Sequence, residues 1–367
     1  MYDVVVIGGN LAGTTATINA ALGGASVTLI EKNRTPFFPP HCGELIPEIA
    51  AKSLHLDKIG CRSNETTTMI FTLNGKNYTF YSKKNKFILF DRHYFEKYLL
   101  DEAARVGADV KLGVKMIDFK PPSEIILDNN HTVEGKIIID ASGISCRVGS
   151  KIGIDTKLKP EDVGVCIQSR IEGKFKLDTT YWNFHRPYAP FGYAWLFPIN
   201  ENLANIGIIV PGGQKLDLDK LLKNYIEERT KGKYKVTSTF RACVPIALPL
   251  KRLVKDNVMI VGDAARLAHS ISGGGIDNAI VSGRLAGKIA SKYVHEELSS
   301  LEAYQHAMRL RVLRLRTEYR SKTKAIKSDE KFVKTYQGIF SILDFVNKLF
   351  PNVSHINLLS DLENIST

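Results

Sequence analysis

Residues 4–13, VVVIGGNLAG, decide the fold of this chain. Four apolar residues read as a buried strand, the glycines mark a tight turn, and the Ala-rich run behind them has helical spacing. A second strand at residues 27–30 ends at Glu31, which stands 23 residues after Gly8. This order predicts a dinucleotide-binding unit, in which the helix N-terminus faces a pyrophosphate and Glu31 accepts hydrogen bonds from a ribose. The alternative is a tight turn that binds nothing.

Each residue of this turn has its own expected task. Gly8 permits the turn, and Gly13 lets the helix pack closely on the strand. Asn10 stands where a second glycine is usual. Asparagine tolerates a left-handed backbone, but its side chain crowds the approach of a pyrophosphate. Ala12 in the turn and Lys32 after Glu31 complete the expected cofactor contacts.

Composition indicates a globular protein of more than one structural unit. The chain has 367 residues, of which 44% are hydrophobic and 24% are charged, close to the average for soluble proteins. Its five cysteines are odd in number and widely spaced. This pattern argues against a disulfide framework or a zinc site and favours a reducing compartment.

Segments for export or membrane insertion are not expected. Residues 3–7 already read as a strand, which leaves no room for a signal peptide. No apolar run approaches the roughly 20 residues that span a bilayer. We therefore expect a cytoplasmic protein, free or peripheral on the inner face of the cell membrane. Its formal net charge of +12 would attract nucleic acid, phospholipid headgroups or an acidic electron carrier, and charge alone does not choose among them.

The chain switches between two kinds of sheet. Residues 66–82 read as a hairpin around Asn74-Gly75, a dipeptide that readily adopts positive φ. Residues 91–106 have the spacing of a helix. Residues 160–245 alternate aromatic and apolar runs, as in an antiparallel sheet.

The predicted fold class is α/β plus antiparallel sheet. A Rossmann-like cofactor-binding domain is interleaved with a β-sheet substrate domain, and a helical C-terminal region follows. We expect the cofactor-binding domain at residues 1–65, 86–155 and 250–298. The substrate domain is expected at residues 66–85 and 156–249, and the helical region at residues 299–367.

A second glycine-rich motif, Gly262-Asp263-Ala264-Ala265, follows a strand at residues 258–261 and precedes Gly273-Gly274-Gly275-Ile276 and a helix. In this order the motifs resemble those of the p-hydroxybenzoate hydroxylase-like FAD superfamily. The resemblance implies that FAD is the cofactor, that Asp263 hydrogen-bonds its ribityl chain, and that the helix N-terminus lies beside the flavin. Backbone N–H groups there would stabilise negative charge on the reduced flavin. The expected contacts are Gly262, Asp263, Gly274, Gly275 and Ile276.

Three further stretches resemble the geranylgeranyl reductase family, which includes archaeal enzymes that saturate the isoprenoid chains of membrane lipids. They are PPHCGE at residues 39–44, DRHYF at 91–95 and GYAWLFP at 192–198. The resemblance implies that Cys42 and Gly43 approach the flavin, that Arg92 faces the cofactor, and that Tyr193 and Trp195 hold prenyl chains near the ring.

Two positions depart from the related motifs. Ser142 stands where the hydroxylases of the superfamily have an Asp, which argues against an NADPH-using hydroxylase, although Gly143 beside it remains an expected cofactor contact. Arg266 stands where the reductases often have Gly, and places a cation near the cofactor or its entrance.

Each candidate side chain also has a plainer interpretation. Cys42 could be a small buried hydrophobe, Arg92 a solvated residue at a helix start, and His269 a loop residue as readily as an active-site one. Tyr193 and Trp195 share one face of a strand. Core packing explains such a pair as well as a substrate wall does.

The C-terminal part combines a basic and an amphipathic pattern. Residues 309–327 hold eight Lys or Arg against one acid, Glu318. Residues 339–350 follow with apolar residues at helical spacing, namely Ile339, Ile342, Leu343, Val346, Leu349 and Phe350. This succession suits attachment to an anionic membrane surface. The alternatives are a solvated helix face and core packing.

The predicted reaction is reduction of carbon–carbon double bonds in a prenyl lipid. The reduced flavin gives hydride, and Cys42, Tyr193 or an ordered water gives the proton; Cys42, Tyr193 and Trp195 are the expected catalytic residues. Electrons are expected from docked NAD(P)H or a ferredoxin-like carrier, and no nucleic acid partner is expected. The alternatives are a flavin monooxygenase, a flavin halogenase, because residues 192–198 also resemble Gly-Trp-x-Trp-x-Ile-Pro, and a non-catalytic electron-transfer flavoprotein.

Overall fold

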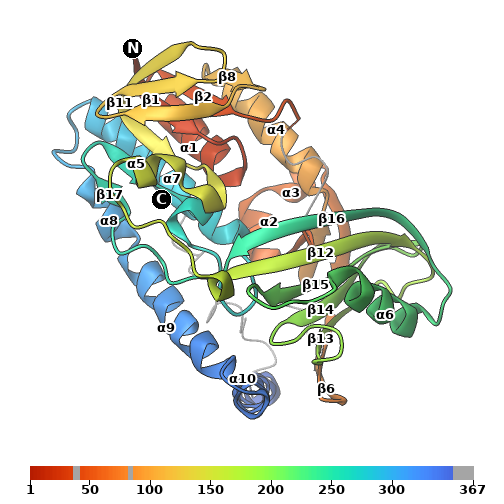
Figure 1. Cartoon of the computed structure of the whole chain (residues 1–367). Helices are drawn as coiled ribbons and strands as arrows, with labels where there is room; N and C mark the ends of the chain where they lie inside the picture. Colours follow the sequence, from red (N-terminus) through yellow and green to blue (C-terminus); the bar gives the residue numbers. More distant parts are fainter. Residues whose placement is uncertain (36–41, 82–85, 350–367) are drawn as a thin grey trace. The chain divides into compact units, whose positions relative to one another are not determined.

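The computed structural model describes residues 1–35, 42–81 and 86–349 (Figure 1). The chain divides into two compact units. Unit 1 contains residues 1–38, 96–159 and 244–319, and unit 2 contains residues 39–95, 160–243 and 320–367. Each unit is therefore assembled from three separate stretches of the chain.

The core of unit 1 is a mainly parallel sheet. Its strands are β1 (Tyr2–Ile7), β2 (Val27–Glu31), β8 (Asp109–Leu112), β11 (Thr132–Asp140), β17 (Val254–Lys255) and β18 (Val258–Ile260), in the order β17-β18-β11-β1-β2-β8. Neighbours from β18 to β8 pair in parallel, and β17 adds an antiparallel edge. Strands β9 (Met116–Lys120) and β10 (Glu124–Leu127) branch from β11. Parallel strands are usually covered on both faces, which accounts for the uniformly apolar and buried residues 4–7.

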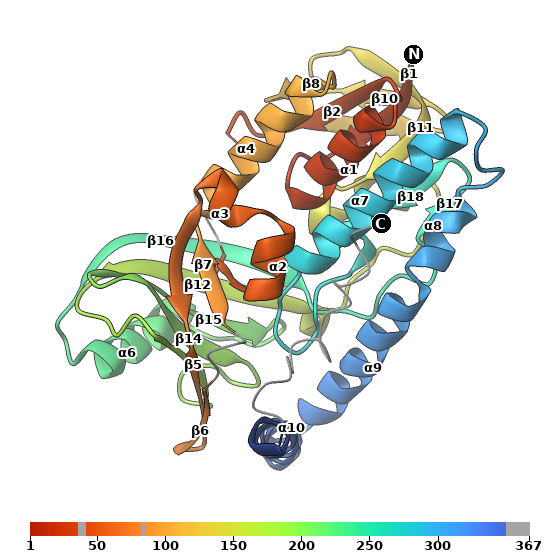
Figure 2. The same ribbon diagram turned by 180° about the vertical axis from the view of Figure 1, so that it is seen from behind.

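Two helices of unit 1, α1 (Leu11–Leu22) and α7 (Ile276–Val294), lie side by side (Figure 2). Two glycines of α7 permit this contact. A Cβ atom at Gly283 would lie 2.2 Å from the carbonyl oxygen of Ala12, and one at Gly287 would lie 2.3 Å from that of Ala16. Any larger side chain would separate the helices. Unit 1 also contains most of α4 (Arg92–Arg105), α5 (Arg147–Lys151), α8 (Glu302–Ala307) and the 3-10 turns η1 (Gly143–Ser145) and η3 (Gly262–Ala265).

Unit 2 is built on a seven-stranded sheet. Its strands are β5 (Thr68–Leu73), β6 (Lys76–Tyr81), β12 (Val163–Glu172), β13 (Thr179–Phe184), β14 (Tyr193–Asn200), β15 (Leu203–Pro211) and β16 (Lys235–Pro245), in the order β16-β12-β15-β14-β13-β5-β6. The hairpin predicted at residues 66–82 is confirmed, since β5 and β6 pair around Asn74 and Gly75, whose φ angles are 47° and 79°. Helix α6 (Leu218–Thr230) packs on one face through Leu222, Tyr225 and Ile226.

A separate three-stranded sheet corrects the expected domain boundaries. We expected residues 42–65 and 86–95 in the cofactor-binding domain, as part of its ranges 1–65 and 86–155, but they belong to unit 2. There β3 (Leu45–Pro47), β7 (Phe87–Phe90) and β4 (Arg62–Thr66) pair with one another, beside the short helices α2 (Glu48–Ser53) and α3 (Leu56–Ile59). The Asn64 amide ties them to the larger sheet, because it donates to the carbonyl oxygens of Leu177 and Pro198 at 2.9 and 2.7 Å.

We expected residues 299–367 to form a separate helical region. The described helices of this region instead belong to units 1 and 2. Helix α9 (Arg309–Ala325) begins in unit 1 and ends in unit 2, and α10 (Asp329–Leu349) belongs to unit 2. The buried Phe332, Tyr336 and Phe340 of α10 pack against aromatic rings of unit 2. Among the described residues, no helix combines the length and the apolarity that crossing a bilayer requires.

Candidate functional site

The N-terminal turn of unit 1 has no room for side chains at two glycines. Gly8 has φ of 108°, and a Cβ atom there would lie 2.2 Å from the carbonyl oxygen of Ala141. At Gly13 a Cβ atom would lie 1.7 Å from the carbonyl oxygen of Gly8. Both predicted tasks are confirmed, because Gly8 allows the turn and Gly13 lets α1 approach β1.

The carboxylate of Glu31 organises the same turn. It is 5% exposed, and its two oxygens accept hydrogen bonds from the backbone N–H of Gly9 at 2.7 Å and of Asn33 at 2.8 Å. Lys32 and Asn10 are exposed. Asn10 does not use the left-handed backbone that we considered for it, since its φ is −85° and ψ −175°, and its side chain does not cap α1. The N–H groups of the first turn of α1 are therefore not taken by a side-chain cap, as an anion-binding helix terminus requires.

The second glycine-rich motif meets this helix. Gly262 has φ of 57°, and a Cβ atom there would lie 2.8 Å from the Cβ of Ala12, which is consequently a packing residue of α1. The Gly262 N–H donates to Ser282 Oγ at 3.0 Å. A Cβ atom at Gly275, the N-cap of α7, would lie 3.4 Å from Asp263 Oδ1. The structure thus brings the Asp263 carboxylate to the start of α7, directly before Ile276.

The turn after β11 is held by Asp140 together with Ser142, whose Oγ accepts the N–H of Arg147 at 2.8 Å. Asp140 is fully buried, and its carboxylate accepts hydrogen bonds from Ser142 Oγ at 2.6 Å and from the N–H groups of Val148 and Gly149, each at 2.9 Å. Around Gly143, with φ of 69°, a Cβ atom would meet nothing within 4 Å. Gly143 therefore borders open space, which a ligand can occupy.

Arg266 does not present its guanidinium freely. Its Nη2 donates to the carbonyl oxygens of Asp155 and Lys157 at 3.2 and 3.0 Å. This cation therefore ties η3 to the loop at residues 155–157.

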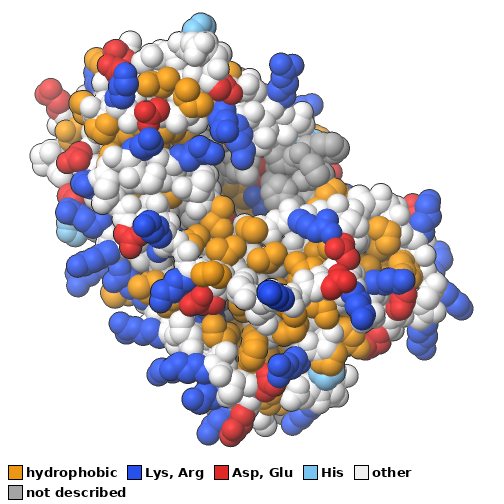
Figure 3. Space-filling view, in the orientation of Figure 1, with side chains coloured by type: hydrophobic (Ala, Val, Ile, Leu, Met, Phe, Trp, Pro, Cys, Tyr) orange, Lys and Arg blue, Asp and Glu red, His pale blue; other side chains and the backbone are white. Residues whose placement is uncertain are grey.

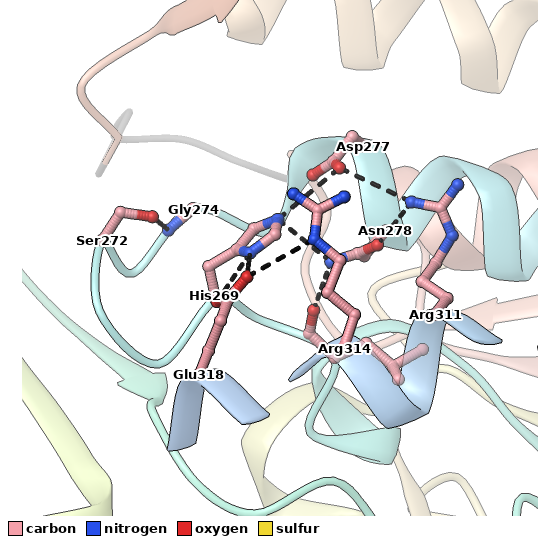
Figure 4. Close-up of polar contacts among 9 residues, drawn as sticks. His269, Ser272, Gly274, Asp277, Asn278, Arg311, Arg314 and Glu318 are labelled. Atoms are coloured by element: carbon pink, nitrogen blue, oxygen red, sulfur yellow. Dashed lines mark hydrogen bonds and ion pairs between the residues drawn. The ribbon is translucent and has the colours of Figure 1, made fainter. Parts of the chain in front are cut away.

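A cluster of charges holds the loop that precedes α7 (Figure 4). The N–H of His269 donates to the carbonyl oxygen of Gly274 at 2.7 Å, and the N–H of Gly273 donates to that of His269 at 2.8 Å. The imidazole lies between two carboxylates, with Nδ1 2.9 Å from Glu318 Oε2 and Nε2 3.7 Å from Asp277 Oδ2. His269 therefore joins the glycine loop to both α7 and α9.

Arginines balance the negative charge of this cluster. Arg311 Nη1 lies 3.8 Å from Asp277 Oδ2, and Arg314 Nε lies 3.8 Å from Glu318 Oε1. Burial opposes a charge on His269, but hydrogen bonds and charges from Asp277 and Glu318 outweigh it and raise its pKa to about 9. Burial likewise opposes the charge of Asp277, yet His269 and Arg311 hold its pKa below the usual range. His269 is thus a cation at neutral pH.

Unit 2 presents an aromatic face on its large sheet. Tyr193, Trp195 and Phe197 alternate along β14 with Ala194 and Leu196, and all five are buried. The ring centroids of Tyr193 and Trp195 lie 5.8 Å apart, and those of Trp195 and Phe197 lie 6.2 Å apart. The shared face of Tyr193 and Trp195 is confirmed. Ala194 and Leu196 point to the opposite face, into the aliphatic cluster under α6.

Trp195 lies over a glycine of the next strand. Trp195 pairs with Gly207 on β15 and with Trp182 on β13. A Cβ atom at Gly207 would lie 2.3 Å from Trp195 Cζ2, so the ring occupies the space that a side chain would fill. No acceptor for the buried indole N–H is found in the part of the chain that the structure describes.

A buried carboxylate anchors the segment that carries Cys42 and Gly43. Glu44 is 3% exposed, has φ of 61°, and accepts hydrogen bonds from Arg170 Nη2 at 2.6 Å and Asn205 Nδ2 at 2.8 Å. Its other oxygen accepts the backbone N–H of Arg92 at 3.4 Å. Burial raises the pKa of Glu44, and the Arg170 charge opposes that rise.

The anchored segment approaches the aromatic face. A Cβ atom at Gly43 would lie 3.0 Å from Phe197 Cε2 and 3.7 Å from Trp195 Nε1. The half-buried Cys42 accepts the N–H of Glu44 at its sulfur, 3.3 Å away. Pro39, Pro40 and His41 of the same motif lie outside the described residues. Unit 2 therefore brings Cys42 and Gly43 together with Tyr193 and Trp195.

Sequence reasoning gave no role to Glu44, Arg170, Asn205 or Gln168. Glu44 was part of the quoted motif, but its partners stand 126 and 161 residues away. A signal existed in β15, where Asn205 interrupts an otherwise apolar strand. No group of His, Cys, Asp or Glu among the described residues is arranged to hold a metal ion.

The chain is similar in sequence to reductases of geranylgeranyl lipids. A family model for the geranylgeranyl reductase catalytic domain matches residues 162–244. A digeranylgeranylglycerophospholipid reductase of Methanosarcina acetivorans is 32% identical over 319 residues, 82% of this chain and 78% of the relative. One from Methanopyrus kandleri is 29% identical over 330 residues, 83% and 85% of the two chains.

Solved structures agree with these relatives. A geranylgeranyl bacteriochlorophyll reductase-like protein of Thermoplasma acidophilum superimposes with a TM-score of 0.83 at 26% identity, over 98% of this chain and 99% of that chain. A flavin-dependent brominase superimposes with a TM-score of 0.72 at 18% identity, over 98% and 94% of the two chains, and shares the fold.

Proposed function

The chain belongs to the geranylgeranyl reductase family and is an oxidoreductase of carbon–carbon double bonds, and we propose that it uses FAD to saturate geranylgeranyl chains of a membrane-lipid precursor. The observation that carries this proposal is the buried aromatic face of β14, against which Glu44 anchors Cys42 and Gly43. Large apolar rings suit an isoprenoid chain, which offers no polar group for most of its length.

FAD would be held mainly by the two glycine-rich turns of unit 1. The uncapped start of α1 suits the pyrophosphate, and Glu31 suits an unphosphorylated ribose. Asp263 at the start of α7 suits the ribityl chain. The proposed contacts are Gly8, Asn10, Ala12, Gly13, Glu31, Lys32, Gly143, Gly262, Asp263, Gly274, Gly275 and Ile276, together with Cys42, Gly43 and Arg92.

When bound and reduced, FAD supplies the hydride. An isolated alkene accepts hydride poorly, so protonation of the second carbon must lead or accompany the transfer. Burial raises the pKa of Tyr193, so its phenol gives up a proton reluctantly. We therefore assign Tyr193 and Trp195 to alignment of the prenyl chain, and the proton to the Cys42 thiol or a water molecule beside it.

Anaerobic mixing of the reduced protein with a prenyl lipid tests the reductase. Flavin absorbance should return as the double bonds become saturated, with one alkene reduced for each flavin reoxidised. A monooxygenase or halogenase would require O₂ for its reaction, and a non-catalytic carrier would leave the lipid unsaturated. Repeating the cycle with NAD(P)H or with a reduced ferredoxin identifies the electron donor.

Helix α9 offers a surface for an anionic membrane. Leu310 and Leu313 are 76% and 49% exposed, and Figure 3 shows Lys and Arg side chains gathered over this helix. The buried Phe332, Tyr336 and Phe340 of α10 serve core packing instead, since they pack against aromatic rings of unit 2. Ile342 is exposed, and the side chains of Leu343, Val346, Leu349 and Phe350 lie outside the described residues. We therefore place the membrane contact on α9.

Vesicle binding tests this contact. Binding to anionic vesicles should weaken as salt rises, because exposed charges are screened. Leu310→Ser combined with Leu313→Ser should weaken it further, whereas Ile342→Ser on α10 is the matched control. Equal binding to neutral and anionic vesicles at low salt would contradict the electrostatic contribution.

A further inference from the structure

Gln168, on β12, is a buried side chain without a partner. It is 4% exposed, and neither its amide nitrogen nor its amide oxygen makes a hydrogen bond with any residue that the structure describes. Most buried side-chain polar atoms in proteins have at least one partner, and an exception calls for an explanation. A molecule that binds at this position would supply one.

The position of Gln168 is on the aromatic face. Gln168 pairs with Gly207, Gly207 pairs with Trp195, and Trp195 pairs with Trp182. Residues opposite one another on paired strands point to the same face. The Trp195 ring lies over Gly207. The ring therefore extends across β15 in the direction of Gln168. The unpartnered indole N–H of Trp195 and the unpartnered amide of Gln168 therefore belong to one row of the same face, in which Gly207 is the only residue between them.

The charges beside this pair are already balanced. In the next row of the face, Arg170 pairs with Asn205. The Arg170 guanidinium donates to Glu44 at 2.6 Å and to Asn205 Oδ1 at 3.2 Å. An anionic ligand would have to compete with the buried Glu44 carboxylate for this cation. The groups left without partners in this row are neutral: the indole N–H, the amide NH₂ and one carbonyl acceptor.

These three groups complement one neutral O–H group, which both donates and accepts. We propose that Gln168 and the indole N–H of Trp195 bind such a group on the aromatic face. It is either a hydroxyl on the prenyl substrate or a water molecule held beside the chain. The inference rests on the proposed function, since Trp195 is there assigned to the prenyl chain, and it adds a polar contact to an otherwise apolar surface.

Gln168→Met tests the site, because methionine keeps the length of the side chain and removes both amide groups. The control is Gln214→Met, at an exposed position where the amide donates to the carbonyl oxygen of Pro211. Trp195→Phe removes the indole N–H and keeps a ring. For each variant we would measure the thermal midpoint without ligand, and KM and kcat for anaerobic flavin reoxidation by geranylgeraniol and by its methyl ether.

A ligand-binding Gln168 and a structural one give opposite results. Gln168→Met should keep or raise the midpoint, because it removes buried groups that have no protein partner. It should raise KM for geranylgeraniol about tenfold, and Trp195→Phe should shift KM in the same direction. If the hydroxyl belongs to the substrate, KM for geranylgeraniol should rise more than KM for the methyl ether, which accepts hydrogen bonds but donates none. A bound water makes both values rise equally. Either pattern supports the proposal.

A lower midpoint with both KM values at the parental level would overturn it and make Gln168 a core residue. If neither prenyl compound reoxidises the flavin of the parental protein, that result contradicts the proposed function. The shift of the thermal midpoint by geranylgeraniol still reports on the site in that case, since it requires no turnover. Loss of that shift in Gln168→Met but not in Gln214→Met supports the site, and an equal shift in all three proteins overturns it.

Discussion

Gly207→Ala should disturb the aromatic face through a single methyl group. The added Cβ would lie 2.3, 2.7 and 2.8 Å from Cζ2, Cε2 and Cη2 of Trp195, whereas carbon atoms in contact prefer about 3.5–4.0 Å. The ring would have to move by roughly 1 Å or more to restore that spacing. Tyr193 and Phe197 flank the ring, so we expect a loss of about 1–3 kcal/mol in the free energy of unfolding.

Urea unfolding of four proteins measures this coupling. Gly207→Ala and Trp195→Ala are compared singly and together with the parental protein. In the absence of the ring the new methyl group enters vacated space, so Gly207→Ala should cost much less in the Trp195→Ala background. Gly338→Ala on α10 is the control, because a Cβ atom there would meet nothing within 4 Å and alanine favours a helix by roughly 0.5–1 kcal/mol.

Two results would refute this reasoning. One is a Gly207→Ala protein as stable as the parental protein, which would mean that the ring does not occupy the space over Gly207. The other is an equal cost with and without Trp195, which would place the strain elsewhere in β15.

Three further predictions concern buried charges and the cofactor. Arg170→Met should lower the free energy of unfolding by about 3 kcal/mol at neutral pH, because it leaves the Glu44 carboxylate buried and unpaired. This loss of stability should shrink at lower pH, where Glu44 can take up a proton. A loss that does not depend on pH would argue against this cause. The pKa of His269 is raised from 6.5 to about 9. The charged imidazole therefore contributes fully to stability below pH 6.5, and this contribution is lost as pH rises through 9, at no more than about 1.4 kcal/mol per pH unit. His269→Gln should remove this pH dependence of the free energy of unfolding, measured by urea titration. Asp263→Ala should lower the flavin content of the purified protein, and a parental protein that stays colourless after incubation with FAD would contradict the cofactor assignment.

Local patterns made much of the fold predictable. Asn74-Gly75 predicts its hairpin because the turn depends on the backbone preferences of two adjacent residues. Residues 4–13 predict a strand, a turn and a helix, because glycine alone fits positions as crowded as Gly8 and Gly13. The spacing of Tyr193 and Trp195 predicts their shared face, because alternate residues of a strand point the same way.

Pairings between distant segments could not be predicted in this way. Residues 42–65 lie in unit 2 because β3 and β4 pair with β7, and nothing in their composition indicates that partner. The same holds for Glu44, whose burial is tolerable only because Arg170 and Asn205 reach it from two other strands. Helical spacing at residues 339–350 indicates an amphipathic helix, but a helix that binds a membrane and one that packs on a sheet have the same spacing.

Two aromatic residues of unit 2, Phe340 and Trp195, have different expected roles. The ring centroid of Phe340 lies 5.0, 5.4 and 5.2 Å from those of Phe71 on β5, Tyr78 on β6 and Phe184 on β13. Trp195 instead contacts Tyr193 and Phe197 of its own strand. Truncation of either Phe340 or Trp195 removes a buried ring and should cost about 3–5 kcal/mol, so loss of stability does not separate the two roles.

Substrate reoxidation separates them. Trp195→Ala should impair anaerobic reoxidation of the flavin by a prenyl substrate while FAD remains bound, because the chain loses a surface that aligns it. Phe340→Ala is the control, because it also removes a buried aromatic ring. It should keep the parental rate of flavin reoxidation at a temperature where both variants are folded. Flavin content, thermal midpoint and reoxidation rate should be measured on the same preparations. If Trp195→Ala is reoxidised at the parental rate across substrate concentrations, Trp195 belongs to the core in the same sense as Phe340, and the prenyl chain must lie against another surface.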